Sequence, residues 1–400
     1  MWTKHNNFAN IIRDSWNSQG SNVSDFFFKL SNMLTVWNRE TFGNLFYNKK
    51  RTFARLQGVQ HCLSSNYRAS LATMEEHLIK EYNNIIEQEE LFWLQKSRNC
   101  WLKEGDRNIK KFHLSTLVRR RRNKLEGLKN EDGVWTQDKE EMKDVAIRYF
   151  KKLFTANDSL GNFEQLPLMF LLLRDETKAC INTAVGEDEV QQSLFGIGSL
   201  KAPGPYGFPA GFFQKYWNVC KCDLIKMVQY SFETGVVPVD INQTLITLVP
   251  KTDCPMEMSQ LRPISLCNTT YKVISKIIVQ RLRHLLPNII SPNQVAFVPG
   301  RQIQDNIVVA QEVLHKLKTS KGRSGYFAWK IDLAKAYDRL QWNFIWKVLG
   351  EVGIDGKMAD LIMNCVSSVQ YRIVLNGEVT TSFTPGSDIR QVTPYPPTSL

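Results

Sequence analysis

The sequence predicts an α+β fold, in which a helical first part precedes a second part that mixes helices with strands. Between about Ser24 and His113, apolar residues recur at helical spacing and Gly and Pro are rare, which indicates long helices arranged as a hairpin or coiled coil. From Gly186 onward, amphipathic segments alternate with short apolar runs that end at turn-forming residues, as strands do. We therefore predict a basic helical region over 1–180 and a mixed region over 186–391.

The charge of the chain indicates its class of partner. The formal net charge is +12 and the pI is about 9.2. An excess of this size favours a polyanionic partner, most simply nucleic acid, although a basic surface that contacts only water is the alternative. The eight cysteines are scattered and form no Cys-x-x-Cys pair, so we expect free thiols, a reducing compartment and no structural zinc site.

No segment predicts secretion or a membrane span. The N-terminus lacks the charged-then-apolar pattern of a signal peptide. The longest apolar run, residues 166–173, is far shorter than the roughly 20 residues that a bilayer-spanning helix needs. We therefore expect an intracellular protein that is not secreted and has no membrane partner.

The helical region ends in a basic run with aromatic residues close by. Residues 96–113 alternate basic residues with Trp101, Phe112 and His113, and a run of four arginines follows. Such a run is most often a solvated face, but basic and aromatic side chains together also suit contact with a nucleic-acid backbone. The candidate nucleic-acid contacts are Arg119, Arg120, Arg121 and Arg122. Beyond them we predict a β-hairpin that turns at residues 131–133, then a helix over 139–154.

The second region predicts an ordered series of elements. A helix with acidic residues in its first turn follows Gly186, and residues 201–213 are dense in Gly and Pro, which predicts a fixed loop. A strand ends at Pro250, and an amphipathic helix from about residue 271 ends at Pro287. Further helices are expected over 306–318, 342–353 and 357–369. The last element is a hairpin over 371–383 with an Asn-Gly type I′ turn.

A carboxylate stands at the end of a predicted strand. Residues 326–331 are an apolar run that reads as a buried strand, and Asp332 follows it directly. Two-metal enzymes of phosphoryl transfer use carboxylates to hold their metal ions, and a strand end can place one rigidly. The alternative is that Asp332 caps the next helix.

Several ordered motifs of this chain resemble one family. The stretches are "KAPGPYGFPAGFF", "LRPISLCNTTYKVISKIIVQRL", "SPNQVAFVPGRQIQDNI" and "KIDLAKAYDRL", with "WLKEGDRNIKKFH" and "EDGVWT" before them. Together they resemble the reverse transcriptase of LINE-type (non-LTR) retrotransposons, the plant kind in particular. Tyr206 departs from the pattern, because the family usually has Asp there. The resemblance implies a basic helical linker followed by the fingers and a partial palm of a right-hand polymerase.

The resemblance also assigns roles to single residues. Asp332 matches the metal ligand of the palm, and Leu333 would offer a backbone carbonyl to the nucleotide. Tyr337 matches the bulky residue that excludes a ribose 2′-OH, whereas we expect Asp338 to be structural. The remaining implied contacts are to the incoming nucleotide for Arg262, Lys272 and Gln391, and to the template and nucleotide vicinity for Arg301. The implied cofactor is Mg²⁺, and the implied partners are an RNA template and a DNA primer.

The resemblance ends abruptly near the C-terminus. Ile389, Arg390 and Gln391 match the next palm motif, but the residues after Gln391 do not. Deleting one G from codons for the family's Gln-Gly-Asp-Pro-Leu-Ser-Pro-Tyr-Leu yields Gln-Val-Thr-Pro-Tyr-Pro-Pro-Thr-Ser, which is the tail found here. We therefore expect 392–400 to be a frameshifted tail, and the chain to be truncated before the Asp-Asp pair that completes the metal site.

Three interpretations follow from the sequence. The first is a reverse transcriptase fragment that is inactive as it stands. The second is a non-catalytic remnant that binds RNA or DNA, and the third is an unfolded product of a decayed element. For either of the first two we expect a ribonucleoprotein in the nucleus, the cytoplasm or both.

Overall fold

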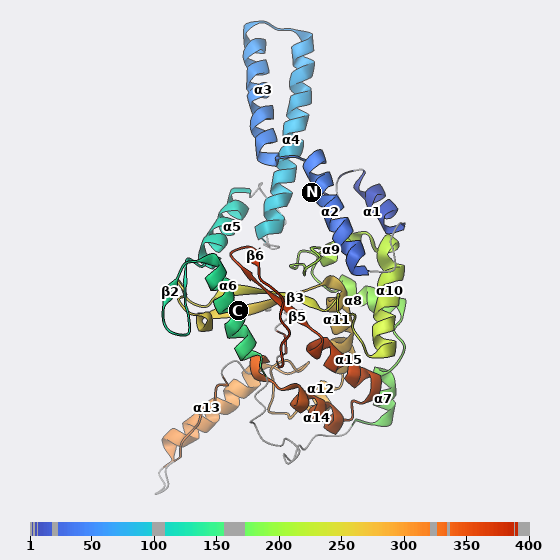
Figure 1. Cartoon of the computed structure of the whole chain (residues 1–400), viewed down its shortest axis with the longest axis vertical. Coiled ribbons are helices and arrows are strands. Elements are labelled where there is room, and N and C mark those ends of the chain that lie inside the picture. Colours follow the sequence, from blue (N-terminus) through green and yellow to red (C-terminus); the bar gives the residue numbers. More distant parts are fainter. Residues whose placement is uncertain are drawn as a thin grey trace.

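A central body with two projections makes up the molecule (Figure 1). The computed structural model describes residues 2, 5, 7–17, 23–97, 109–155, 173–320, 326–333, 337–387 and 389–390. A helical hairpin of α3 (Leu45–Ser65) and α4 (Ala69–Ser97) projects from one end, and α13 (Ile303–Thr319) projects from the other. Helices and a sheet together confirm the predicted α+β class.

The other helices and the short elements surround the sheet or connect its parts. The helices are α1 (Phe8–Asn17), α2 (Val23–Thr41), α5 (Ile109–Asn123), α6 (Lys139–Leu153), α7 (Asp175–Ile181), α8 (Glu187–Phe195), α9 (Ala210–Lys215), α10 (Trp217–Thr234), α11 (Thr269–Arg283), α12 (Leu286–Ile289), α14 (Trp342–Val352) and α15 (Gly356–Ser367). A small hairpin pairs β1 (Leu128–Lys129) with β2 (Trp135–Thr136), and single 3₁₀ turns cover Met258–Gln260 and Tyr337–Arg339.

A four-stranded sheet in the order β4–β3–β5–β6 forms the centre of the body. β3 (Gln243–Pro250) lies between antiparallel β4 (Leu261–Cys267) and parallel β5 (Gln370–Leu375), and β6 (Glu378–Val379) pairs with β5 as a hairpin. Buried and half-buried residues alternate along β3 and β5. Because side chains of a strand point to alternate sides, the sheet has one buried face and one half-exposed face.

Helix α6 packs in one hydrophobic cluster with the buried face of the sheet. Tyr371 is 1% exposed there, and its ring centroid lies 5.5 Å from that of Phe154 and 5.8 Å from that of Phe383. Asp138 begins the helix, because its carboxylate accepts two backbone N–H bonds from the first turn. Helix α6, from the first half of the chain, thus covers β3 and β5 from the second half.

A second hydrophobic cluster joins the N-terminal helices to the rest of the body. It combines side chains of α1 and α2 with those of α8, α9, α10, α11 and α15. Trp16 of α1 also donates a 2.7 Å hydrogen bond from Nε1 to Asp223 of α10. Both clusters contain side chains from both sides of the boundary near residue 186, so this boundary stays a prediction.

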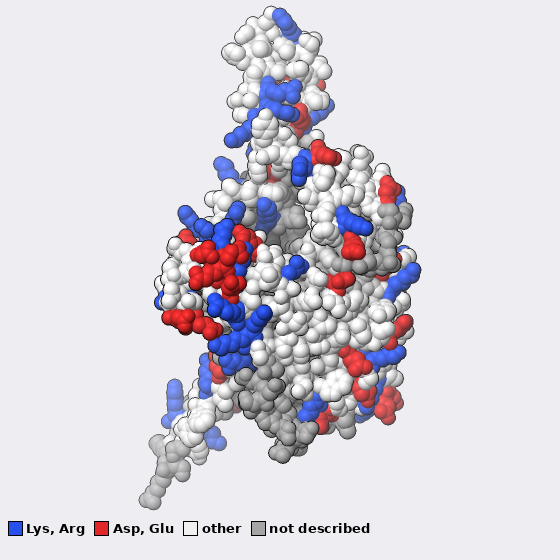
Figure 2. Space-filling model, in the orientation of Figure 1, with Lys and Arg blue, Asp and Glu red and all other residues white. Residues whose placement is uncertain are grey.

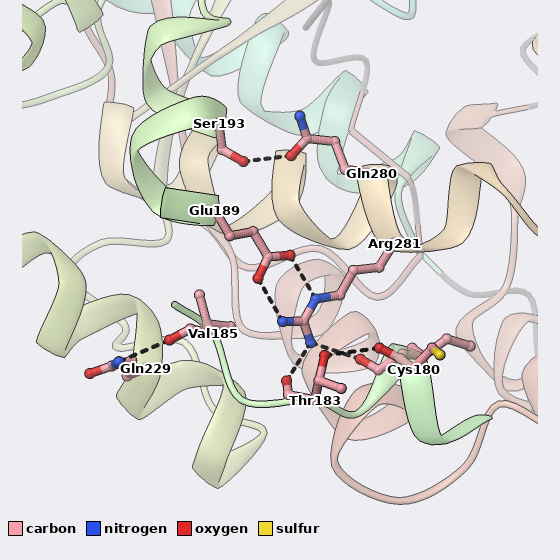
Figure 3. Close-up of polar contacts among 9 residues, drawn as sticks. Cys180, Thr183, Val185, Glu189, Ser193, Gln229, Gln280 and Arg281 are labelled. Carbon is pink, nitrogen blue, oxygen red and sulfur yellow. Dashed lines mark hydrogen bonds and ion pairs between the residues drawn. The ribbon is translucent and has the colours of Figure 1, made fainter. Parts of the chain in front are cut away.

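Arg281 of α11 ties α8 to the end of α7 and the loop that follows it (Figure 3). Its guanidinium donates to both carboxylate oxygens of Glu189 on α8, at 2.8 and 2.7 Å. It also donates to the backbone carbonyls of Ile181 and Thr183, at 2.8 and 2.7 Å. The ring of Phe232 on α10 lies 5.0 Å from the guanidinium carbon. A bidentate pair of this kind fixes both position and orientation.

The predicted elements agree with the structure except in three places. Asn376 and Gly377 have φ of 50° and 93°, as a type I′ turn requires, and the predicted helical hairpin is α3–α4. The loop predicted over 201–213 ends earlier, because α9 begins directly after Pro209, whose fixed φ suits the start of a helix. The helix predicted to reach Pro287 ends at Arg283. The third exception is the strand before Asp332.

Candidate functional site

The buried strand predicted over 326–331 is wrong. Residues 326–333 form neither strand nor helix, and Tyr326, Phe327, Trp329 and Ile331 are 68%, 78%, 79% and 76% exposed. A strand needs a neighbour that takes up its backbone N–H and C=O groups. The four strands of the central sheet pair with one another and not with this segment. The apolar sequence predicts burial, but among the described residues no strand pairs with this segment and its large side chains stay exposed.

Asp332 and the residues after it lie on this open segment. Asp332 is exposed, and Leu333 beside it is 72% exposed. Tyr337 begins a 3₁₀ turn, in which Asp338 is 6% exposed, a burial that suits the structural role predicted for it. Among the described residues, no group of three or more His, Cys, Asp or Glu could hold a metal ion.

The donor set found here does not fit Mg²⁺. This ion takes six oxygen ligands in octahedral geometry and is bound through carboxylates together with phosphates. The described segment offers the Asp332 carboxylate and the carbonyl of Leu333. We therefore derive no catalytic step through a metal from these residues.

Arg262 and Lys272 lie at opposite ends of β4. Arg262 is exposed near the start of β4, opposite Val249 on the neighbouring strand β3. Lys272 lies beyond the other end, on α11, and its Nζ donates a 2.7 Å hydrogen bond to the backbone carbonyl of Ala202. The structure thus separates the two predicted phosphate contacts by most of a strand, and it gives Lys272 a second role in holding the 201–208 loop.

Arg372 shares the half-exposed sheet face with Arg262, and the motifs did not indicate it. It lies on β5 opposite Leu245, whereas Arg262 lies on β4 opposite Val249, and both β3 residues face away from α6. The alternation in "QYRIVL" was the available signal, because it places Tyr371 and Ile373 on the buried side and Arg372 on the other.

Arg301 holds a loop. Its guanidinium donates hydrogen bonds to the backbone carbonyls of Pro287, Ile290, Ser291 and Gln294, at 2.5 to 3.1 Å. Four carbonyl acceptors on one guanidinium fix the path of the chain between α12 and α13. The role near template and nucleotide that the motif implies stays a prediction.

The arginine run lies at the end of α5, next to the end of α4. All four of its members are exposed, although Arg119 also donates a 3.0 Å hydrogen bond to the carbonyl of Ser97. Lys96 of α4 lies nearby, and its pKa is lowered by partial burial and by the charge of Arg120. Its Nζ lies 4.1 Å from the centroid of the Phe92 ring, within the range of a cation–π contact.

Basic and aromatic side chains therefore meet where α4 and α5 cross. The rings of Trp93 and His113 lie 4.4 Å apart, whereas Phe112 is buried at 2% exposure and is a core residue. Trp101, the other aromatic residue of the prediction, lies outside the described residues. On the face drawn in Figure 2, basic side chains are spread over several elements, and acidic ones gather over the start of α6.

Arg390 is a further residue whose role the motifs did not indicate. Its side chain is 8% exposed, and its guanidinium carbon lies 4.1 Å from the centroid of the Tyr271 ring. Gln391, the predicted nucleotide contact that follows it, lies outside the described residues. No helix among the described residues is long and apolar enough to cross a membrane.

Comparisons with known proteins show which families this chain is similar to. Residues 249–389 match the family model described as reverse transcriptase (RNA-dependent DNA polymerase). This span includes Arg262, Lys272, Arg301, Asp332 and Tyr337. Residues 249–389 are therefore similar to a reverse transcriptase domain, which agrees with that part of the resemblance seen in the motifs.

Two relatives belong to transposable elements. The chain is 27% identical over 300 residues to the Transposon TX1 uncharacterized 149 kDa protein of Xenopus laevis, a match that covers 75% of this chain and 23% of that protein. It is 24% identical over 216 residues to the Retrovirus-related Pol polyprotein from type-2 retrotransposable element R2DM of Drosophila melanogaster, covering 54% and 20% respectively. The chain thus spans about a fifth to a quarter of the length of these relatives.

Proposed function

We propose that this chain is a fragment of the reverse transcriptase of a plant LINE-type (non-LTR) retrotransposon. The observation that carries the proposal is the motif order from Arg262 to Asp332 inside the span that matches the reverse transcriptase family. In this proposal an RNA template and a DNA primer are its partners, and Mg²⁺ is the cofactor of the intact enzyme. The fragment would reside in the nucleus or cytoplasm as a ribonucleoprotein.

We also propose that these 400 residues do not extend a primer by themselves. A two-metal site needs several carboxylates at one place. The sequence contains no Asp-Asp dipeptide, and Asp332 is an exposed carboxylate outside any described metal-binding group. The activity that we propose for the fragment itself is binding of nucleic acid.

The crossing of α4 and α5 favours non-catalytic binding as the second candidate function. Arg120, Arg121 and Arg122 are exposed at the end of α5, and the charge of Arg120 acts on Lys96 at the end of α4. The Nζ of Lys96 lies over the ring of Phe92, and Trp93 and His113 pair their rings between the same two helices. Guanidinium groups contact phosphates, and aromatic faces stack on unpaired bases. Such binding requires neither Asp332 nor a metal ion.

Binding can be measured by fluorescence anisotropy with a labelled RNA template annealed to a DNA primer. We expect the logarithm of affinity to fall linearly with the logarithm of salt concentration, with a slope of roughly −0.7 for each phosphate contact on single strands. The same mixture with Mg²⁺ and deoxynucleotides should yield no extended primer. Absence of binding at low salt would overturn the proposal, and primer extension would overturn the inactivity.

Two variants that lose the same number of positive charges test where the nucleic acid binds. Arg120→Gln/Arg121→Gln/Arg122→Gln removes three charges from α5, and Arg148→Gln/Lys151→Gln/Lys152→Gln removes three exposed charges from α6. We expect the first variant to weaken binding and flatten the salt slope more than the second. Equal losses would show that general charge, and not the crossing of α4 and α5, carries the affinity.

A further inference from the structure

Helix α13 projects from the body with a firmly held base (Figure 1). Arg301 fixes the chain before it, and Asn306 in its first turn donates a 2.9 Å hydrogen bond to the backbone carbonyl of Asn293. Beyond this base, the described part of the chain buries none of the helix's 17 residues. A helix of this length is marginal in water by itself, because most helical stability in proteins comes from packing of an apolar face. The described residues thus leave α13 without the packing on which it depends.

One side of α13 has the apolar seam of a two-helix coiled coil. The seam consists of residues that follow one another at spacings of four and three, which is the heptad pattern of positions that face a neighbouring helix: Ile303, Ile307, Ala310, Leu314 and Leu317. Ile303, Ile307 and Leu314 are 62%, 50% and 49% exposed. The small side chain of Ala310 leaves room for a larger one from another helix. The seam is therefore continuous, uncharged and open to a neighbouring helix.

The charges of α13 fit a reversed copy of the same helix. At 3.6 residues per turn, Asp305, Glu312 and Lys316 lie on the side opposite the seam, so a helix packed on the seam buries none of them. Asp305 lies in the first turn, whereas Lys316 and Lys318 lie in the last. An antiparallel second copy brings the basic end of each helix to the acidic end of the other, and a parallel copy brings like charges together. The helix is therefore complementary in charge to an antiparallel copy of itself.

We propose that two copies of this chain form a dimer through an antiparallel pair of α13 helices. In the register that suits the seam, Ala310 of each copy meets Leu314 of the other, and Ile307 meets Leu317. A small side chain then faces a large one, and the same patch serves both copies, as in the twofold dimers that are the commonest oligomers. The interface involves no nucleic acid, so this proposal goes beyond the proposed function and does not rest on it.

Sedimentation equilibrium of the nuclease-treated full chain tests the dimer over a series of protein concentrations. We expect the average mass to rise from 46.2 kDa towards twice that value as the concentration increases. Amide hydrogen exchange in residues 303–319 should slow over the same range, because packing in the dimer holds the helix. A monomer at all concentrations would overturn the proposal, and so would a dimer in which the exchange of α13 does not depend on concentration.

Two matched variants separate the seam from general apolar association. Ile307→Gln/Leu314→Gln changes the seam and should weaken the dimer at least about a hundredfold, because each copy loses two buried side chains. Val308→Gln/Val309→Gln changes two residues that are 53% and 58% exposed but lie off the seam, and it should weaken the dimer less than about threefold. Equal losses would overturn the proposal. Both variants should melt as the wild type does at concentrations where all are monomers, and a lower melting temperature of the seam variant there would mean that the seam packs on its own body.

Disulfide cross-linking tests the orientation of the two helices. A disulfide requires Cβ atoms about 3.5–4.5 Å apart. Under mild oxidation, an equal mixture of Ala310→Cys and Leu314→Cys chains should therefore form a cross-linked dimer above the level of the wild type, which controls for the native cysteines. Neither variant alone should do so, because in the antiparallel register each of these positions faces the other. Cross-linking of Ala310→Cys with itself, as parallel helices would give, or no cross-link in the mixture, would overturn the antiparallel pair.

Discussion

Two apolar stretches of this molecule, β5 and residues 326–331, have opposite environments. In β5, Tyr371, Ile373 and Leu375 are 1%, 0% and 4% exposed, whereas Phe327 and Trp329 are 78% and 79% exposed. β5 lies between β3 and β6, and its buried side shares a hydrophobic cluster with α6. Neither pairing nor cover is described for 326–331. The comparison teaches that an apolar pattern becomes a buried strand only when the fold supplies a neighbour and a covering layer.

The largest effect expected from this comparison is on stability. Tyr371→Ala should lower the free energy of unfolding by about 3–5 kcal/mol, because it opens a cavity among Phe154, Phe383 and the sheet. Trp329→Ala removes a larger side chain, but it should change stability by no more than about 0.5 kcal/mol, as substitutions at exposed positions do. Urea denaturation followed by circular dichroism measures both.

A loss in Trp329→Ala comparable to that in Tyr371→Ala would contradict the comparison, since it would mean that 326–331 is covered in solution. Tyr371→Phe is the control for the core position, because it keeps the ring and removes only the hydroxyl. Its stability should lie much closer to the wild type than to Tyr371→Ala.

A smaller effect is expected at the turn that closes β5. Asn376 accepts a 2.9 Å hydrogen bond from the backbone N–H of Leu125 and donates a 2.8 Å bond to the carbonyl of the same residue. It also has a φ of 50°. Asn376→Ala should therefore cost about 1–2 kcal/mol, from lost hydrogen bonds and from a backbone angle that alanine disfavours.

Asn376→Gly separates the two causes in the same urea experiment. Glycine adopts a positive φ without strain but forms no side-chain hydrogen bond. If the contact to Leu125 dominates, the glycine variant should lose nearly as much stability as the alanine variant. A glycine variant as stable as the wild type would assign the whole effect to the backbone angle.

Local patterns in the sequence predicted many of the regular elements, although α1, α7, α10 and β4 were not among them. The Asn-Gly turn at 376–377, the acidic first turn of α8 and the spacing in α3 and α4 depend on residues close together in the chain. The motifs also indicated the family whose model matches the span that includes Asp332. These features are encoded locally, so they can be read without knowledge of the fold.

The features that the sequence did not predict depend on contacts between residues far apart in the chain. The exposure of Trp329 follows from the absence of a described neighbour, and the burial of Arg390 follows from contacts with β3, α11 and α15. The motif indicated a ligand contact for Arg301 and no role for Arg390, whereas the guanidinium groups of both donate hydrogen bonds to their own chain. Contacts of this kind become visible only when the fold brings the partners together.

The smallest effect concerns the surface where α6 meets β6. Hydrogen bonds from Lys143 and Lys139 lower the pKa of Glu378 to about 2. The hydrogen bonds that Lys143 donates to Glu140 and Glu378 raise the pKa of Lys143 to about 12. A carboxylate whose pKa is lowered by folding stabilises the folded state above its unfolded pKa, about 4.5, and this contribution disappears as pH falls towards 2. Glu378→Gln should therefore lower the melting temperature slightly at pH 7 and leave it unchanged near pH 2. Because the side chains of Lys139 and Glu378 are exposed, the difference at pH 7 should also shrink with added salt. Glu126→Gln, a change at another exposed carboxylate, is the control. If the melting temperature of Glu378→Gln differed from that of the wild type at pH 2 as much as at pH 7, Glu378 would act through its shape and not through its charge.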